Sequence, residues 1–175
     1  MAGHLDIGSN GVTGALPEEL YDLTNLISLN VSDTSIGGEI SSNIGAFSNL
    51  FYLYAGKTGM DGSLPTQLFS LIQLQKLDLS VASFTGTLSE SFSNLVNLDL
   101  IKLDHNQFDG TIPLGLENLP FLETLELDNN DMTGSVPQEL CDRRGEGFME
   151  LQVLTVDCFG ESPEVSCQCC TNCPM

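Results

Sequence analysis

Apolar residues recur along the chain in a fixed order within a 24-residue unit. One leucine-type residue is followed by a second after three positions and by a third after two more, as in Leu74, Leu77 and Leu79. Residues two apart on a strand point to the same face, so Leu77 and Leu79 share an apolar face while Lys76 and Asp78 point away from it. The pattern predicts a short strand at 74–79 and at each 24-residue offset from it.

A glycine follows each strand region and precedes, after one residue, an apolar residue and then proline or serine. These glycines are Gly14, Gly38, Gly62, Gly86, Gly110 and Gly134. Glycine adopts backbone angles that other residues avoid and proline suits turns, so we expect the chain to turn back here. One strand cannot bury its apolar face alone. Stacking the units pairs neighbouring strands about 4.8 Å apart and closes a continuous apolar interior.

The complete unit, L-x-x-L-x-L-x-x-N-x-x-x-G-x-I-P-x-x-L-x-x-L-x-x, resembles the plant-type leucine-rich repeat over about residues 2–156. The resemblance implies an α/β repeat: a right-handed solenoid with a parallel β-sheet on its concave face and short 3-10 or irregular segments on its convex face. Such repeats build the ectodomains of receptor-like kinases and receptor-like proteins, and also polygalacturonase-inhibiting proteins. The resemblance thus implies a recognition module that is not an enzyme, whereas the ligand depends on the variable positions.

The asparagine position of the unit varies along the chain. It holds Asn10, Thr34, Thr58, Ala82, Asn106 and Asn130. In this kind of repeat the asparagine side chain lies inside the turn and hydrogen-bonds backbone groups that lack other partners. Threonine can make part of these bonds and alanine none, so we expect looser or hydrated turns around the third and fourth repeats.

The repeat ends after Leu140, where an insertion at 141–147 precedes a last strand containing Leu151 and Leu154. We therefore divide the chain into leucine-rich repeats at 1–150 and a final strand with a cysteine-rich cap at 151–175. The six cysteines all lie near this end: Cys141, Cys158, Cys167, Cys169, Cys170 and Cys173. An even count at one end of an acidic repeat protein indicates a disulfide-bonded cap and an oxidising compartment, with the pairing left open.

Zinc is the alternative interpretation of these cysteines. Four thiolates could bind one ion, and the closest four are Cys167, Cys169, Cys170 and Cys173. Their spacing lacks the two C-x-x-C pairs typical of a structural zinc site, and no histidine lies near them in the sequence. We therefore predict disulfides, with neither a metal nor a cofactor.

Charge excludes several classes of partner. The chain has 5 Lys and Arg against 24 Asp and Glu, a formal net charge of −19. Such a chain repels phosphate backbones and anionic membrane surfaces, so we predict no nucleic-acid partner and no direct membrane contact from this segment. No run approaches the roughly 20 apolar residues of a membrane span. With the cysteines, this favours an extracellular or cell-surface location.

The beginning of the chain enters a strand at Leu5 and Ile7 without a signal peptide. Terminal repeats need a polar or cross-linked cap over the open core. We expect a fragment or truncated chain that lacks an upstream signal and cap. The alternative is an intact protein that covers its N-terminal edge by self-association, which its molecular weight in solution would reveal.

Outward positions of successive strands form columns on the concave face, with neighbours about 5 Å apart. The first column is His4, Ser28, Tyr52, Lys76, Leu100, Thr124 and Val153. The second is Asp6, Asn30, Tyr54, Asp78, Lys102, Glu126 and Thr155. The third is Gly8, Ser32, Gly56, Ser80, Asp104, Asp128 and Asp157.

Tyr52 and Tyr54 lie together in these columns, flanked by Lys76, Leu100 and Lys102. The pattern predicts an aromatic, partly basic centre in an otherwise acidic molecule. Aromatic anchors with a few polar neighbours are typical of binding hot spots. The alternative is that tyrosine merely suits strands, but an outward leucine favours binding.

Asp104, Asp128 and Asp157 form an acidic column beside Glu126. Like charges about 5 Å apart repel, so the column indicates a cation, a basic partner or simple solvation. We favour solvation, because no calcium-loop motif is present and Lys102 balances part of the charge. The predicted ligand-binding residues are Tyr52, Tyr54, Lys76, Leu100, Lys102, Asp104, Glu126 and Asp128.

Two isolated features are candidate sites. His105 follows Asp104, but no activated serine or cysteine pairs with it, so we predict no catalysis. Asn30 begins the sequence N-V-S, a candidate glycosylation acceptor on the concave face.

The predicted function is non-enzymatic binding of a protein, peptide or glycan on the concave face of a receptor-like or secreted protein. The alternative is a secreted enzyme inhibitor or structural wall protein. Small hydroxyl residues beside the glycines suggest an ice-binding surface less strongly, because Glu39, Asp61 and Asp109 interrupt them.

Overall fold

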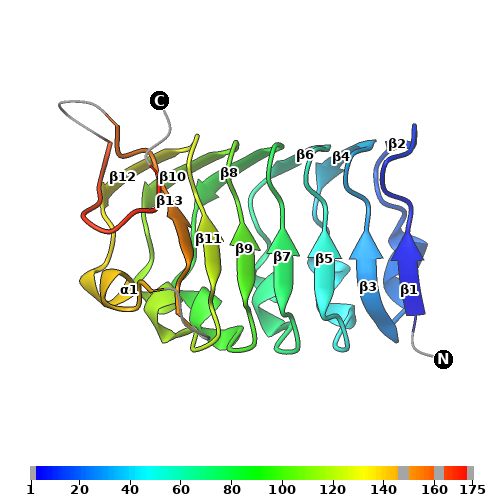
Figure 1. Cartoon of the computed structure of the whole chain (residues 1–175). Helices are drawn as coiled ribbons and strands as arrows, with labels where there is room; N and C mark the ends of the chain where they lie inside the picture. The colour runs from blue at the N-terminus through cyan, green and yellow to red at the C-terminus, as the bar shows by residue number, and fades with distance from the viewer. Residues whose placement is uncertain (1–2, 146–149, 160–163, 173–175) are drawn as a thin grey trace.

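The computed structural model describes residues 3–145, 150–159 and 164–172, which form a stack of parallel strands and short helices (Figure 1). The first sheet takes its strands from successive repeats, paired in chain order. They are β1 Gly3–Asp6, β3 Leu26–Asn30, β5 Tyr52–Tyr54, β7 Lys76–Asp78, β9 Leu100–Lys102, β11 Thr124–Glu126 and β13 Val153–Thr155. The predicted leucine-rich-repeat solenoid, with a parallel sheet on its concave face, is confirmed.

A second parallel sheet accompanies the first along the stack, in segments that the sequence analysis treated as turns. Its strands are β2 Thr13–Gly14, β4 Ser35–Glu39, β6 Gly59–Gly62, β8 Ser83–Thr87, β10 Gln107–Thr111, β12 Asp131–Ser135 and β14 Val165–Ser166. The repeated glycines lie in these strands with positive φ, for example 74° at Gly62 and 82° at Gly86. Glycine is therefore needed for its conformation, as predicted, but the chain pairs with its neighbours here as well as turning.

Short helices return the chain from the second sheet to the first. They are η1 Glu18–Asp22, η2 Ser42–Ala46, η3 Thr66–Ser70, η4 Glu90–Asn94 and η5 Leu114–Asn118, all 3-10, and α1 Gln138–Asp142. Each follows the proline or serine of its repeat. Proline presets φ for a helix start, whereas Ser41 and Ser89 accept hydrogen bonds from backbone amides two residues later, at 3.2 and 3.1 Å. None of the described helices has the length and apolar character to cross a membrane.

The apolar positions of the repeat fill one continuous core between the sheets and the helices. The strand leucines, such as Leu77, are fully buried. Phenylalanines add to this core, where Phe84 and Phe108 stack with ring centroids 6.3 Å apart and Phe69 packs edge-on against Phe92 at 5.0 Å. Each repeat therefore buries its apolar face only against its neighbours, as in other solenoids.

The asparagine positions bond the turns across repeats. Asn106 Nδ2 donates to the backbone carbonyls of Leu79 and Leu103, at 2.9 and 3.1 Å, and its Oδ1 accepts from the Phe84 amide at 3.0 Å. Leu79 and Phe84 belong to the preceding repeat, whose asparagine position is Ala82. The next repeat therefore supplies the partner for these two groups of the alanine-containing turn, and looser or hydrated turns around the third and fourth repeats stay a prediction.

A left-handed backbone conformation recurs one residue before each asparagine position. The residues are Ser9, Asp33, Lys57, Val81, His105 and Asn129, with φ between 52° and 57°. Of these six only Val81 is β-branched, and its side chain is exposed. β-Branched residues are genuine outliers in this region, where the close contact of Cβ with the following carbonyl costs roughly 1–2 kcal/mol.

We predict that Val81→Asn raises the free energy of unfolding by about 1 kcal/mol, because asparagine enters the left-handed region more easily. Urea denaturation measures the change. Val96→Asn is the matched control: Val96 is similarly exposed and outside the positive-φ positions, so its replacement should shift stability by less than about 0.5 kcal/mol. Equal stability of the Val81 variant and the parent would contradict the strain argument.

Candidate binding surface on the concave face

The outward residues of the first sheet lie in the predicted columns. Strand register aligns Tyr52, Lys76, Leu100 and Thr124 in one column, and Tyr54, Asp78, Lys102 and Glu126 in the other. We define the central face as these residues with those just before each strand: Phe51, Gln75, Asp99 and Glu123. Every member is half-buried, with its base on the sheet and part of its surface open to solvent.

The two tyrosines form the aromatic part of the central face. Their rings are nearly parallel, at 9°, with centroids 6.3 Å apart. Phe51 lies beside Tyr52 at a centroid distance of 6.3 Å, and the Tyr52 hydroxyl is 3.2 Å from Gln75 Oε1. Tyr52 is thus held by its neighbours, while the Tyr54 hydroxyl makes no hydrogen bond within the described part of the chain.

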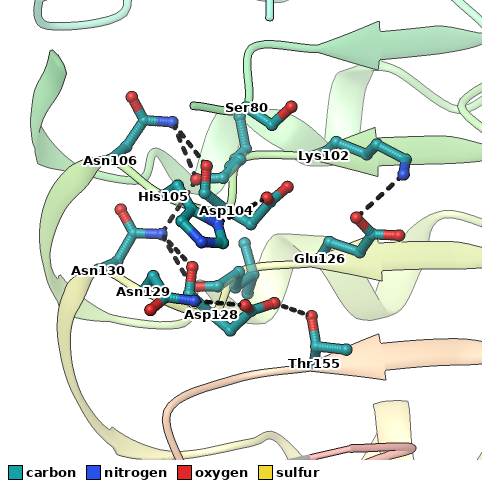
Figure 2. Close-up of polar contacts among 12 residues, drawn as sticks. Ser80, Lys102, Asp104, His105, Asn106, Glu126, Asp128, Asn129, Asn130 and Thr155 are labelled. Atoms are coloured by element: carbon teal, nitrogen blue, oxygen red, sulfur yellow. Dashed lines mark hydrogen bonds and ion pairs between the residues drawn. The ribbon is translucent and has the colours of Figure 1, made fainter. Parts of the chain in front are cut away.

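Carboxylates outnumber lysines on the central face. The carboxylates are Asp78, Asp99, Glu123 and Glu126, and the lysines are Lys76 and Lys102. Lys102 Nζ lies 3.0 Å from Glu126 Oε2 (Figure 2). Burial acts to lower the pKa of Lys102, but the hydrogen bond and charge of Glu126 outweigh it and the pKa is raised. The face is acidic, which corrects the expectation of a partly basic centre.

Sequence analysis missed Asp99 and Glu123, because they lie just before the outward strand columns. The 24-residue offset that joins Phe51, Gln75, Asp99 and Glu123 is the sequence signal that could have identified them. Burial raises the pKa of Asp99, with the charge of Lys76 opposing the shift and that of Glu123 adding to it. Burial also raises the pKa of Tyr54, and nearby negative charges, among them Asp99 and Asp78, add to that shift. In both side chains burial is the main cause of the raised pKa, and neighbouring negative charge adds to it.

The acidic column is bonded to its own loops. Asp157 accepts hydrogen bonds from the backbone amides of Asn129 and Asn130, at 2.7 and 3.0 Å. Asp128 accepts from the Thr155 hydroxyl and from the Asn129 side chain (Figure 2). Among the residues described, no cluster of His, Cys, Asp and Glu is arranged to hold a metal ion. These two carboxylates are fixed acceptors that hold the loops after the strands.

Asp104 differs from its neighbours in that column. One oxygen lies 3.0 Å from His105 Nδ1, and the other is buried with no hydrogen-bond partner among the described residues. Burial raises the pKa of Asp104, the hydrogen bond from His105 opposes this, and the charges of Glu126 and Asp128 add to it. Among the described residues, the hydrogen bonds of the His105 ring include no hydroxyl or thiol that this histidine could activate as a nucleophile.

A polar notch of about 260 Å³ opens beside the central face. It is lined by Ser9, Ser32, Asp33, Gly56, Lys57, Asp78 and Ser80. Gly56 keeps it open, because a Cβ atom there would lie 2.7 Å from Asp78 Oδ1. That oxygen accepts from the amide and hydroxyl of Ser80, at 3.0 and 2.7 Å. Asp78 therefore has a fixed position at the border of the notch and the central face.

The remaining predicted residues lie away from this centre. Disulfide bonds join Cys141 to Cys169 and Cys167 to Cys170, and Cys158 is also disulfide-bonded. The other predicted cap cysteine, at position 173, lies outside the described residues. Of the four cysteines considered for zinc, the three described ones are oxidised and supply no thiolate.

Asn30 lies in the second column. Its Nδ2 donates to the Asp6 carboxylate at 3.0 Å, and its Oδ1 accepts from the Ser32 amide at 3.1 Å. Glycosylation at Asn30 stays a prediction, as does the division of the chain at residue 150.

Comparisons with known proteins agree with this geometry. A family model described as Leucine Rich Repeat matches residues 73–95 and 121–142. The crystal structure of a TDR receptor is 32% identical over 94% of this chain and 26% of its own, with a TM-score of 0.82. The Arabidopsis receptor kinase HAESA, in complex with the peptide hormone IDA and the co-receptor SERK1, is 28% identical over 79% of this chain and 23% of its own, with a TM-score of 0.76.

A plant ice-binding protein shares the fold at 23% identity over 94% of this chain and 49% of its own, with a TM-score of 0.76. No curated protein sequence matches the chain significantly. The stacked parallel strands and asparagine-bonded turns define a leucine-rich-repeat solenoid. The chain contains leucine-rich repeats and is similar to the receptor structures named above, a likeness consistent with the plant-type repeat. It spans about a quarter of the length of the TDR, RGFR1 and HAESA receptor chains.

Proposed function

We propose that this chain is the recognition part of an extracellular or cell-surface protein and binds a peptide on its concave face. The observation that carries the proposal is the stacked Tyr52 and Tyr54 pair on the central face, with Leu100 two strands away in the column of Tyr52. Half-buried aromatic side chains on a rigid sheet supply contact area at a low cost in conformational entropy. Alternating polar neighbours on adjacent strands provide hydrogen-bond partners for a peptide.

Two further observations support the proposal. Two of the similar structures are described as complexes with peptide hormones, RGF2 on the plant receptor RGFR1 and IDA on HAESA. The disulfides near the C-terminal end suit an oxidising compartment, as expected of an extracellular protein. The open face of the sheet favours recognition over catalysis, because it does not enclose a substrate away from water.

We predict that Tyr52→Ala with Tyr54→Ala weakens peptide binding at least tenfold without unfolding the chain, because the pair contributes the aromatic contact area. A random peptide library displayed on phage is selected on the parent protein, and the affinities of the enriched peptides are then measured on both proteins. Circular dichroism checks the fold. Phe159→Ala is the matched control, because Phe159 is exposed and lies outside the central face. Unchanged affinity of the tyrosine variant, or an equal loss in the control, would refute the proposed site.

A further inference from the structure

The central face has unneutralised negative charge next to its aromatic pair. Glu126 is paired with Lys102, which leaves Asp78, Asp99 and Glu123 against the single charge of Lys76. Within the part of the chain that the structure describes, none of these four side chains forms an ion pair within 4.0 Å. Since the molecule as a whole has a formal charge of −19, the surroundings do not compensate this excess.

Tyr54 lies within electrostatic reach of two of these carboxylates, Asp78 and Asp99. It is in strand register with Asp78, and Asp99 is close enough to act on it electrostatically. Tyr52 stacks on one side of the ring, and the Tyr54 hydroxyl has no hydrogen-bond partner in the described residues. A half-exposed aromatic ring bordered by carboxylates is a favourable environment for an organic cation, through attraction to the ring and charge-assisted hydrogen bonds.

We infer that the ligand is a basic peptide, one arginine or lysine side chain of which lies against Tyr54 and pairs with Asp78 and Asp99. This inference rests on the proposed function and adds the chemistry of the ligand. Arginine fits best, because its planar guanidinium can stack on the ring and still donate to carboxylates. Asp78 suits this role since Ser80 fixes its Oδ1 and the notch leaves space beside it.

Other ligand charges fit this surface less well. An acidic peptide would meet three carboxylates that have no ion-pair partner, and like charges across an interface oppose binding by several kcal/mol. A bare metal ion lacks a described cluster of ligands. A basic peptide instead relieves the repulsion between Asp99 and Glu123, and the acidic surroundings accelerate its encounter with the face.

The test uses the peptides that the library yields on the parent protein. We expect the enriched peptides that depend on Tyr54 to share an arginine or lysine. Replacing that residue with neutral citrulline or norleucine should weaken binding about tenfold. Asp78→Asn with Asp99→Asn should weaken binding of the basic peptide to a similar extent but leave binding of the neutral peptide unchanged. The protein double variant and the neutral replacement in the peptide remove the same interaction. Asp109→Asn is the control: Asp109 is exposed on β10, and its replacement should leave affinity unchanged.

The outcomes separate the two proposals. Tyr54-dependent peptides without a basic residue, or additive losses in the double-mutant cycle, would overturn the basic-peptide inference and leave peptide binding intact. If no enriched peptide depends on the tyrosines, the proposed function itself is wrong and the inference fails with it. A shared basic residue with coupled losses supports both.

Discussion

Replacing Cys141 and Cys169 together with alanine is expected to lower the free energy of unfolding of the C-terminal repeats by about 3.5 kcal/mol. The bond joins residues 28 apart in sequence, so its loss frees a long loop in the unfolded chain. In the folded chain it ties α1 to the closing segment, residues 164–172, which contains β14. That segment adds a strand to β12, where the Val136 amide donates to the Ser166 carbonyl at 2.9 Å.

The second described disulfide is the matched control. Cys167 and Cys170 are only 3 apart in sequence, so replacing both with alanine should cost about 2 kcal/mol on the same chain-entropy argument. Hydrogen exchange of the Val136 and Val165 amides measures the opening of this end directly, since the Val136 amide donates to the Ser166 carbonyl and the Val165 amide donates to the Asp157 carbonyl. Equal effects of the two double variants, or a larger effect of the short loop, would contradict this account.

The first sheet could be predicted because the repeat has a constant length. A fixed 24-residue offset brings equivalent residues side by side, so placing Leu77 and Leu79 in the core also placed Lys76 and Asp78 outside. The same argument predicts that Tyr52 and Tyr54 share a strand, and that Lys76 and Leu100 lie beside Tyr52 in order on the next two strands. Repetition replaces the long-range information that other folds require.

The second sheet could not be predicted in the same way. Segments such as Ser83–Thr87 are short, mostly polar and contain glycine. Their sequences alone therefore do not predict strands. They pair because the first sheet and the core already hold adjacent repeats at strand spacing. The disulfide pairing was also open, since the contact of Cys141 with Cys169 depends on how α1 meets the closing segment.

The charge of the candidate site shows a further limit. Lys76 and Lys102 in the columns predict a partly basic centre, but the structure adds Asp99 and Glu123 from the positions before the strands. It also shows that Glu126 already neutralises Lys102. The sign of the local electrostatic field depends on such neighbouring charges. The sequence columns alone left the charge of the ligand undefined, whereas these neighbours favour a basic ligand.

The asparagine positions lead to a prediction that depends on the order of the repeats. Thr34 donates to the carbonyl of its own repeat, at Val31, at a distance of 2.7 Å. Threonine at an asparagine position therefore keeps the bond to its own turn and loses those to the preceding turn. The loss of stability caused by such a threonine therefore depends on which residue the preceding repeat has at its asparagine position.

We predict that Asn106→Thr lowers the free energy of unfolding by about 3 kcal/mol, because it leaves two buried groups of the preceding turn, the Leu79 carbonyl and the Phe84 amide, without their partner. Ala82 cannot replace it. Asn130→Thr is the matched control and should lower the free energy of unfolding by about half as much. It leaves the Phe108 amide without its partner, but the Leu103 carbonyl keeps its hydrogen bond from Asn106. Guanidinium denaturation of both variants measures the difference. Equal losses of stability in the two variants would show that the repeat containing Ala82 does not depend on its neighbour. Adding Ala82→Asn to Asn106→Thr should restore a hydrogen bond to the Leu79 carbonyl and reduce the loss of stability.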